Sequence, residues 1–171
     1  MDKTRVDGDF LALLNEHRGA IQRAARLYTA SPADREDLIQ EIVFQLWRAF
    51  PSYRRESAPL TWVYRIALNT AITGLRRRTR QPTHLPLDFA FDVPSSLPSS
   101  ENEARTALLY RVVRSLGSVE RALLMCYLDD LSYKQIASVL GISEANVGAR
   151  LNRTKAKLQD LVRGMEEFDG S

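Results

Sequence analysis

The side chains best suited to chemistry in this sequence are two groups of basic residues. The first group is Arg76, Arg77, Arg78 and Arg80, and the second is Arg150, Arg153, Lys155 and Lys157. Residues 1–81 contain 14 basic and 9 acidic side chains, whereas residues 101–171 contain ten of each. Because the positive charge is local, two separate anionic contacts are predicted. A helix dipole explains one or two of the four arginines, and a solvated helix face is the alternative for the second group.

No catalytic centre is predicted. The two histidines, His17 and His84, lie far apart, and the single cysteine, Cys126, cannot form an internal disulfide or a thiolate metal cluster. Cys126 lies in an apolar run and is expected to be buried. The eight glycines form no phosphate-binding loop. We therefore expect no enzyme activity, no cofactor and no metal.

Composition predicts two small domains joined by a linker. Residues 82–100 hold four of the seven prolines, four serines and no Lys or Arg. Proline removes amide donors and disfavours helix in the residue before it, so this segment separates a domain of residues 1–81 from one of residues 101–171. Apolar residues alternate from Leu85 to Val93, which favours an extended segment in an apolar groove over a short β-strand.

No stretch of 15 residues is continuously apolar, and the N-terminal residues are polar. A membrane span and a secretory signal are therefore not expected, and the chain is predicted to be cytoplasmic, without membrane insertion.

Helical periodicity runs through the first domain. Apolar residues three and four apart predict a helix over residues 9–29. Ser31 is expected to cap a second helix, with Pro32 at its first position, that continues to about Phe50. Ser57 is expected to cap a third helix, which ends in the arginine group.

The second helix carries an apolar stripe. Its predicted buried residues are Leu38, Ile39, Ile42, Val43, Leu46, Trp47 and Phe50. Phe44 falls outside this stripe, next to acidic residues. It is either an edge contact of the core or part of a docking surface.

Four helices are predicted in the second domain, which makes the whole chain all-α. The first is expected to close at Gly117 and the second to begin at a Ser118 cap. Ser132 and Gln135 form a capping box for the third, and Ser143 caps the last, which runs to about residue 164.

The last two helices have the spacing of a helix-turn-helix. Ala137, Gly141 and Val147 occupy the small, glycine and β-branched positions of that motif. Its second helix enters the major groove of DNA, where Asn146 suits adenine and Arg150 suits guanine. Gly148 is unusual in an exposed helix and is interpreted as room for a close backbone or phosphate. The candidate contacts are Ser143, Glu144, Ala145, Asn146, Ala149, Arg150, Arg153 and Lys155.

Three segments in this order resemble an extracytoplasmic-function, or group IV, sigma factor of the sigma-70 family. They are DREDLIQEIVFQLWRAF, then APLTWVYRIALNTAITGLRRR, and, after the linker, LSYKQIASVLGISEANVGARLNRTKAKL. The resemblance covers most of residues 9–162. It implies a sigma region 2-like helical bundle, which docks on the polymerase core and binds the −10 promoter element, and a region 4-like domain, which reads the −35 element. It also implies contacts with the β′ clamp helices and β subunit of bacterial RNA polymerase, with promoter DNA, and with an inhibitory anti-sigma factor.

The resemblance assigns roles to residues of the first domain. The residues similar to the core-polymerase contact are Asp37, Leu38, Gln40, Glu41 and Phe44. Those similar to the −10 contact are Tyr53, Arg54, Arg55, Ser57, Trp62, Tyr64, Arg65, Asn69, Arg76, Arg77 and Arg78. A flipped base regains its lost stacking on aromatic walls, but a core role is the alternative for Trp62 and Tyr64.

The recognition helix departs from the family pattern. Ala145 and Asn146 stand where relatives often have Gly-Thr, and Gly148 stands where they often have a cation. A relative's −35 sequence therefore cannot be transferred to this chain. The alternative function is a free-standing regulator that binds operator DNA without polymerase, which requires a dimer on two-fold symmetric half-sites.

Overall fold

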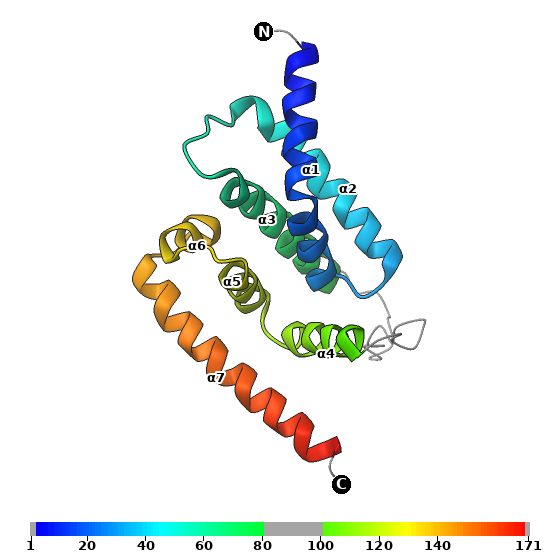
Figure 1. The fold of residues 1–171 in the computed structure, drawn as a ribbon, viewed down its shortest axis with the longest axis vertical. Coiled ribbons are helices and arrows are strands. Elements are labelled where there is room, and N and C mark those ends of the chain that lie inside the picture. Colours follow the sequence, from blue (N-terminus) through cyan, green and yellow to red (C-terminus); the bar gives the residue numbers. More distant parts are fainter. Residues whose placement is uncertain (1–2, 81–100, 170–171) are drawn as a thin grey trace. The chain divides into compact units, whose positions relative to one another are not determined.

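The structure is a computed structural model that describes residues 3–80 and 101–169 (Figure 1). Within these residues it contains α-helices, one short 3-10 helix and no strand, so the all-α prediction is confirmed. The elements are α1 (Lys3–Tyr28), α2 (Pro32–Ala49), η1 (Phe50–Ser52), α3 (Pro59–Arg80), α4 (Glu101–Arg114), α5 (Ser118–Leu128), α6 (Tyr133–Leu140) and α7 (Glu144–Asp169).

The chain divides into two compact units, with α1 to α3 in the first and α4 to α7 in the second. The predicted linker, residues 82–100, lies outside the described residues, as do its expected groove contact and the β-strand alternative. No helix in the described part of the chain has the length and apolar character needed to cross a bilayer.

In the first unit each of the three helices packs against the other two. Ala24 of α1, Ile42 and Leu46 of α2, and Val63 of α3 are completely buried where the helices meet. α1 begins at Lys3, six residues before the predicted start.

The two predicted caps of this unit have different outcomes. Ser31 caps α2 as expected, because its Oγ accepts a hydrogen bond from the amide of Asp34 at 3.1 Å. The Ser57 cap was wrong by one residue. α3 begins at Pro59, and the first intrahelical bond runs from the amide of Trp62 to the carbonyl of Ala58 at 3.1 Å.

In the second unit α5, α6 and α7 pack against one another, and α4 packs on α7. Leu123, Ile136, Val147 and Leu151 fill the core between them. Cys126 is completely buried, as predicted, and burial raises the pKa of its thiol to about 12.

The predictions for Gly117 and Ser118 were wrong. α4 ends at Arg114, and Gly117 has an ordinary φ of −61° and caps the start of α5, in which Ser118 is the first helical residue. The Arg121 side chain donates to the carbonyls of Arg114 and of Leu116, the latter at 2.8 Å. The guanidinium of Arg121 therefore satisfies these two carbonyls. In the predicted cap, the backbone amide of a left-handed glycine would have bound carbonyls at the end of α4 instead.

Candidate nucleic-acid and partner interfaces

The predicted docking residues lie along α2, because residues three and four apart share a helix face. Asp37, Gln40, Glu41 and Phe44 are exposed, while Leu38 is buried and anchors the helix to its neighbours. Phe44 exposes 52% of its surface, so the docking alternative for this ring is favoured over a core contact.

An almost wholly apolar groove of about 640 Å³ runs between α1 and α2 beside these residues. Its rim includes Leu11 of α1, 58% exposed, and Phe44 and Trp47 of α2. The prediction that Trp47 is buried was wrong, since 41% of its surface is exposed. Phe10 of α1 is buried against the edge of the indole, with ring centroids 5.0 Å apart, and leaves the outer part of Trp47 uncovered. The sequence analysis missed both Trp47 and Leu11 as surface residues.

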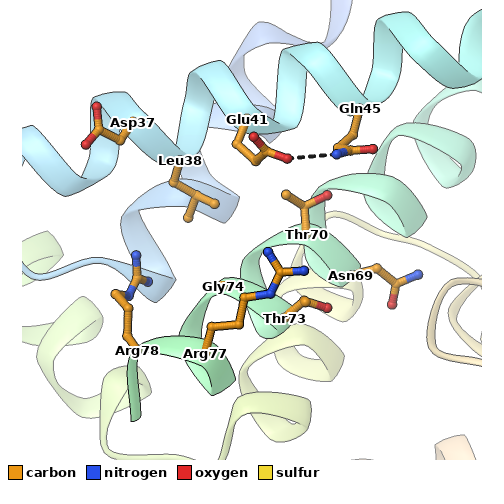
Figure 2. Close-up of a pocket in the computed structure, with 10 residues that line it drawn as sticks. All are labelled: Asp37, Leu38, Glu41, Gln45, Asn69, Thr70, Thr73, Gly74, Arg77 and Arg78. Atoms are coloured by element: carbon orange, nitrogen blue, oxygen red, sulfur yellow. Dashed lines mark hydrogen bonds between the residues drawn. The ribbon is translucent and has the colours of Figure 1, made fainter. Parts of the chain in front are cut away.

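A second cavity, of about 460 Å³, lies between α2 and α3 (Figure 2). Asp37 and Glu41 of α2 line it opposite Asn69 and Arg77 of α3. Glu41 accepts a hydrogen bond from Nε2 of Gln45 at 2.7 Å. The cavity therefore joins carboxylates predicted to bind polymerase with polar and basic groups predicted to bind DNA.

The arginines at the end of α3 differ in their contacts. Arg76, Arg77 and Arg78 are all exposed, but Nη2 of Arg78 donates to the carbonyl of Tyr28 at the end of α1, at 3.1 Å. The guanidinium of Arg77 makes no hydrogen bond or ion pair with another residue that the structure describes. Arg78 thus has a structural contact in addition to any role in binding DNA.

The loop between η1 and α3 has a defined shape. The Tyr53 hydroxyl donates to the carbonyl of Ser57 at 2.9 Å, and its ring stacks on Trp62 with centroids 4.5 Å apart. Burial raises the pKa of Tyr53, and the positive charge of Arg55 opposes that shift. Arg55 itself has a φ of 58°, which is rare for a residue other than glycine and is frequent at binding sites. This loop borders a pocket of about 550 Å³, whose other wall is α1.

The remaining −10 candidates fall into two sets. Arg54, Arg65 and Asn69 are exposed on the same unit. Trp62 and Tyr64 are 7% and 0% exposed, which favours the core alternative for their rings. Nη2 of Arg23 donates to the Tyr64 hydroxyl at 3.3 Å. Trp62 can therefore act on a base only through Tyr53, the ring that covers it.

The helix-turn-helix geometry is present in α6 and α7. Ser132 and Gln135 exchange the two bonds of a capping box, at 3.2 and 2.8 Å. Gly141 has left-handed φ and ψ of 67° and 36°, and its amide donates to the carbonyl of Ala137 at 2.9 Å. Val147 is completely buried where α7 crosses α6. The motif predicted from these positions is therefore formed.

The predicted −35 residues nearly all face solvent. Those exposed are Ser143, Glu144, Ala145, Asn146, Ala149, Arg150 and Arg153. The Ser143 cap is formed, because its Oγ accepts from the amide of Asn146 at 3.3 Å. A β-carbon at Gly148 would lie 3.5 Å from the Tyr133 ring, so the room beside this glycine faces α6.

Two cations of the second basic group are engaged within the unit. Nζ of Lys155 lies 3.9 Å from the ring centroid of Tyr127, in cation–π geometry. Nζ of Lys157 forms an ion pair with Oε2 of Glu120 at 3.0 Å. Arg150 and Arg153 are thus the more available cations of the group.

Comparison with known families gives two matches, one in each unit. Residues 13–81 match Sigma-70 region 2, and residues 107–158 match Sigma-70 region 4. The order and separation of the two regions agree with the two units of the structure.

Similar curated proteins are named as ECF RNA polymerase sigma factors. The chain is 31% identical to the ECF RNA polymerase sigma-E factor of Escherichia coli K12, over 76% of each chain. It is 28% identical to SigM of Mycobacterium tuberculosis over 92% of this chain and 80% of that protein. It is 29% identical to SigG of the same species over 90% of this chain, but spans only 49% of SigG.

Solved structures share the fold. The sigma factor RpoE of Bartonella quintana, solved in complex with the anti-sigma factor NepR, superposes with a TM-score of 0.74 at 18% identity, over 91% of this chain and 97% of RpoE. CnrH, solved in complex with the cytosolic domain of CnrY, gives 0.65 at 24% identity, over 91% and 88% of the two chains. These structures show the shared fold, and the two family matches with the curated relatives show that this chain belongs to the extracytoplasmic-function class of the sigma-70 family.

Proposed function

We propose that the chain is a promoter-specificity subunit of bacterial RNA polymerase, without catalytic chemistry of its own. The observation that carries the proposal is the presence in one chain of a region 2 and a region 4 unit, each with an exposed binding face. By this proposal the first unit binds the core and the −10 element, and the second unit binds the −35 element. Such a subunit works in the cytoplasm, where the polymerase is.

The docking face combines charge with an apolar anchor. Asp37 and Glu41 offer carboxylates to a basic surface, which on this proposal belongs to the β′ clamp helices. Phe44 and Trp47 are large, partly exposed aromatics beside an apolar groove, and aromatic anchors of this kind carry much of the free energy of protein association. Leu38 supports the face from beneath. The proposed partner also includes the β subunit of the core.

The −10 strand is proposed to contact the loop and α3. Tyr53, backed by the buried Trp62, presents an aromatic ring on which a flipped base can stack. Arg54, Arg65 and Asn69 supply polar and cationic groups around it, and Arg76 and Arg77 bind phosphates further along α3. Because Tyr64 is buried, its role is to support this helix.

The −35 duplex is proposed to receive the exposed face of α7. Asn146 and Arg150 read base edges, and each good base pairing contributes about 1–3 kcal/mol of discrimination. Arg153 holds the DNA backbone. The sigma factor RpoE of Bartonella quintana was solved with the anti-sigma factor NepR, and we propose that this chain has an inhibitor of that kind.

A core-binding experiment tests the docking face. The charge-reversal pair Asp37→Arg and Glu41→Arg, and separately the aromatic pair Phe44→Ala and Trp47→Ala, should each weaken binding to purified bacterial core by more than tenfold. The matched control for charge is Glu36→Arg, an exposed position on the same helix.

The aromatic control is Leu128→Ala, because Leu128 is 57% exposed in the other unit. Unchanged far-UV circular dichroism verifies that each variant is folded. Transcription by the reconstituted enzyme from a randomised promoter library then tests promoter choice. Specific gel shift of duplex DNA by the chain alone, with no binding to core, would instead establish a free-standing regulator.

A further inference from the structure

The pocket between α1 and the loop that joins η1 to α3 has a negatively charged lining. Asp9 and Glu16 of α1 and Glu56 of the loop line it, and all three side chains are exposed. Asp9 and Glu16 are seven residues apart, which is about two helical turns, so both lie on the same side of α1. None of the three carboxylates forms a hydrogen bond or an ion pair with another residue in the part of the chain that the structure describes. Their negative charges are therefore available to a partner.

The rest of the pocket lining includes apolar and aromatic side chains. Leu13 lies between the two acidic residues of α1 and is buried, and Phe50 and Tyr53 lie on the other wall. The Tyr53 ring is held by its stacking on Trp62 and by the hydrogen bond from its hydroxyl to the carbonyl of Ser57. This wall is therefore formed before any partner binds, as in most ligand pockets.

The volume and the charge of the pocket limit what it can bind. Its volume of about 550 Å³ lies within the range of pockets that take drug-sized ligands, about 300–1,000 Å³. Its lining has three carboxylates and one guanidinium, that of Arg55, so a phosphate is disfavoured. An arginine or lysine side chain fits, because its aliphatic stem packs on apolar surface while its cation reaches the carboxylates. Arginine fits best, since its planar guanidinium also stacks on aromatic rings and pairs with a carboxylate through two hydrogen bonds.

We propose that this pocket binds a basic segment of a protein partner, with an arginine of that segment inserted between α1 and the loop. The stem of the inserted side chain packs on Leu13 and Tyr53, and its guanidinium pairs with Glu16 or another carboxylate of the lining. The left-handed φ of 58° at Arg55 supports a recognition role for this loop, because such strained residues are concentrated at binding sites. Binding of the segment does not depend on the proposed function, because it requires neither the polymerase nor DNA.

The first test measures binding of the full-length chain to a fluorescein-labelled peptide in which glycine and arginine alternate, by anisotropy. At about 0.1 M salt, charges more than about 10 Å apart are largely screened, so the measurement reports local charge pairs. Glu16→Gln should weaken binding by about two- to fivefold, the range expected for an exposed charge pair. A peptide with citrulline in place of arginine has the same shape without the charge, and it should bind at least about fivefold more weakly. Equal affinity for the two peptides would overturn the proposal.

Two triple variants separate the pocket from the overall charge of the chain. The pocket variant neutralises the three lining carboxylates: Asp9→Asn, Glu16→Gln and Glu56→Gln. The control variant neutralises three exposed carboxylates outside the pocket: Glu36→Gln, Asp130→Asn and Asp160→Asn. The pocket variant should bind the arginine peptide about tenfold more weakly or worse, because the losses of separate charge pairs add, and the control should change by less than about twofold. Equal losses in two variants with unchanged far-UV circular dichroism would refute binding at this pocket.

Photo-crosslinking to the unsubstituted chain locates the peptide without relying on any variant. A benzophenone group placed beside the central arginine of the peptide should label residues 9–16 or 50–59, identified by mass spectrometry of the digested chain. Labelling confined to other segments would contradict the assignment of the pocket. Loss of promoter-directed transcription or of core binding would concern the proposed function alone, because neither polymerase nor promoter DNA is present in these measurements.

Discussion

Replacing either of two glycines of the helix-turn-helix with alanine should change stability in opposite directions. Gly141 has a φ of 67°, and an added β-carbon would meet no atom within 4 Å. Its replacement therefore costs only backbone strain, which is about 1–2 kcal/mol for a left-handed residue. Gly148 lies within α7, where alanine is favoured over glycine by about 1 kcal/mol, and its new methyl group would make an ordinary contact with Tyr133.

The chain contains a separate probe for each unit. Cys126, the only cysteine, is completely buried in the second unit, and burial raises the pKa of its thiol to about 12. The Cys126 thiolate attacks an electrophilic thiol reagent, so Cys126 is labelled when this unit opens. The two tryptophans, Trp47 and Trp62, both lie in the first unit and report on its unfolding alone.

Gly141→Ala should therefore accelerate labelling of Cys126 by about 5- to 30-fold, and Gly148→Ala should slow it by about fivefold. Neither substitution should move the urea midpoint of tryptophan fluorescence. If both variants shift labelling in the same direction, the backbone geometry assigned to this motif is incorrect. A shift in the fluorescence midpoint would refute the independence of the two units.

Other predictions concern charged groups of the second unit. The backbone amide of Gly117, and then Lys157, lower the pKa of Glu120 in the folded chain. Glu120 therefore stabilises the unit fully above the ordinary glutamate pKa, and this stabilisation is lost as pH falls through the lower pKa of the folded state. In urea melts followed by circular dichroism, Glu120→Gln should make stability depend less on pH in this acid range. Arg121→Ala should destabilise the unit by about 1–3 kcal/mol through the lost bonds to the carbonyls of Arg114 and Leu116, seen as faster thiol labelling. Arg153→Gln should reduce the slope of log K for duplex binding against log salt concentration by about one. Lys155→Gln should reduce this slope by much less, because its ammonium group lies on the Tyr127 ring.

The features predicted correctly from sequence are those decided within a few residues. A capping box needs Ser132 and Gln135 three residues apart, and a left-handed turn favours glycine at 141 whatever surrounds it. The Ser31 cap is local in the same way. These caps and turns depend on backbone amides and on side chains a few residues away. The local sequence pattern alone therefore indicates where they form.

Two features that were not predicted depend on a side chain from outside the local turn. Gly117 was expected to end α4, but α4 ends at Arg114, and the guanidinium of Arg121 binds the carbonyls of Arg114 and Leu116. The contact between the Lys155 ammonium group and the Tyr127 ring was likewise not predicted. The side chains of arginine and lysine are long enough to reach several possible partners, and the sequence does not specify which partner each one binds.

The case of α2 explains why periodicity alone could not locate the docking face. One apolar stripe of this helix repeats every fourth residue and is buried; it consists of Leu38, Ile42 and Leu46. A second stripe has the same spacing, turned by about 100° around the helix; it consists of Ile39, Val43 and Trp47. Both stripes satisfy the pattern of a core helix equally well. Among the described residues of this unit, α1 and α3 are the α-helices that pack along α2, and they cover the first stripe and leave the second at the groove edge. The apolar surface that exceeds what a three-helix unit can cover is therefore the part of α2 that we assign to a partner.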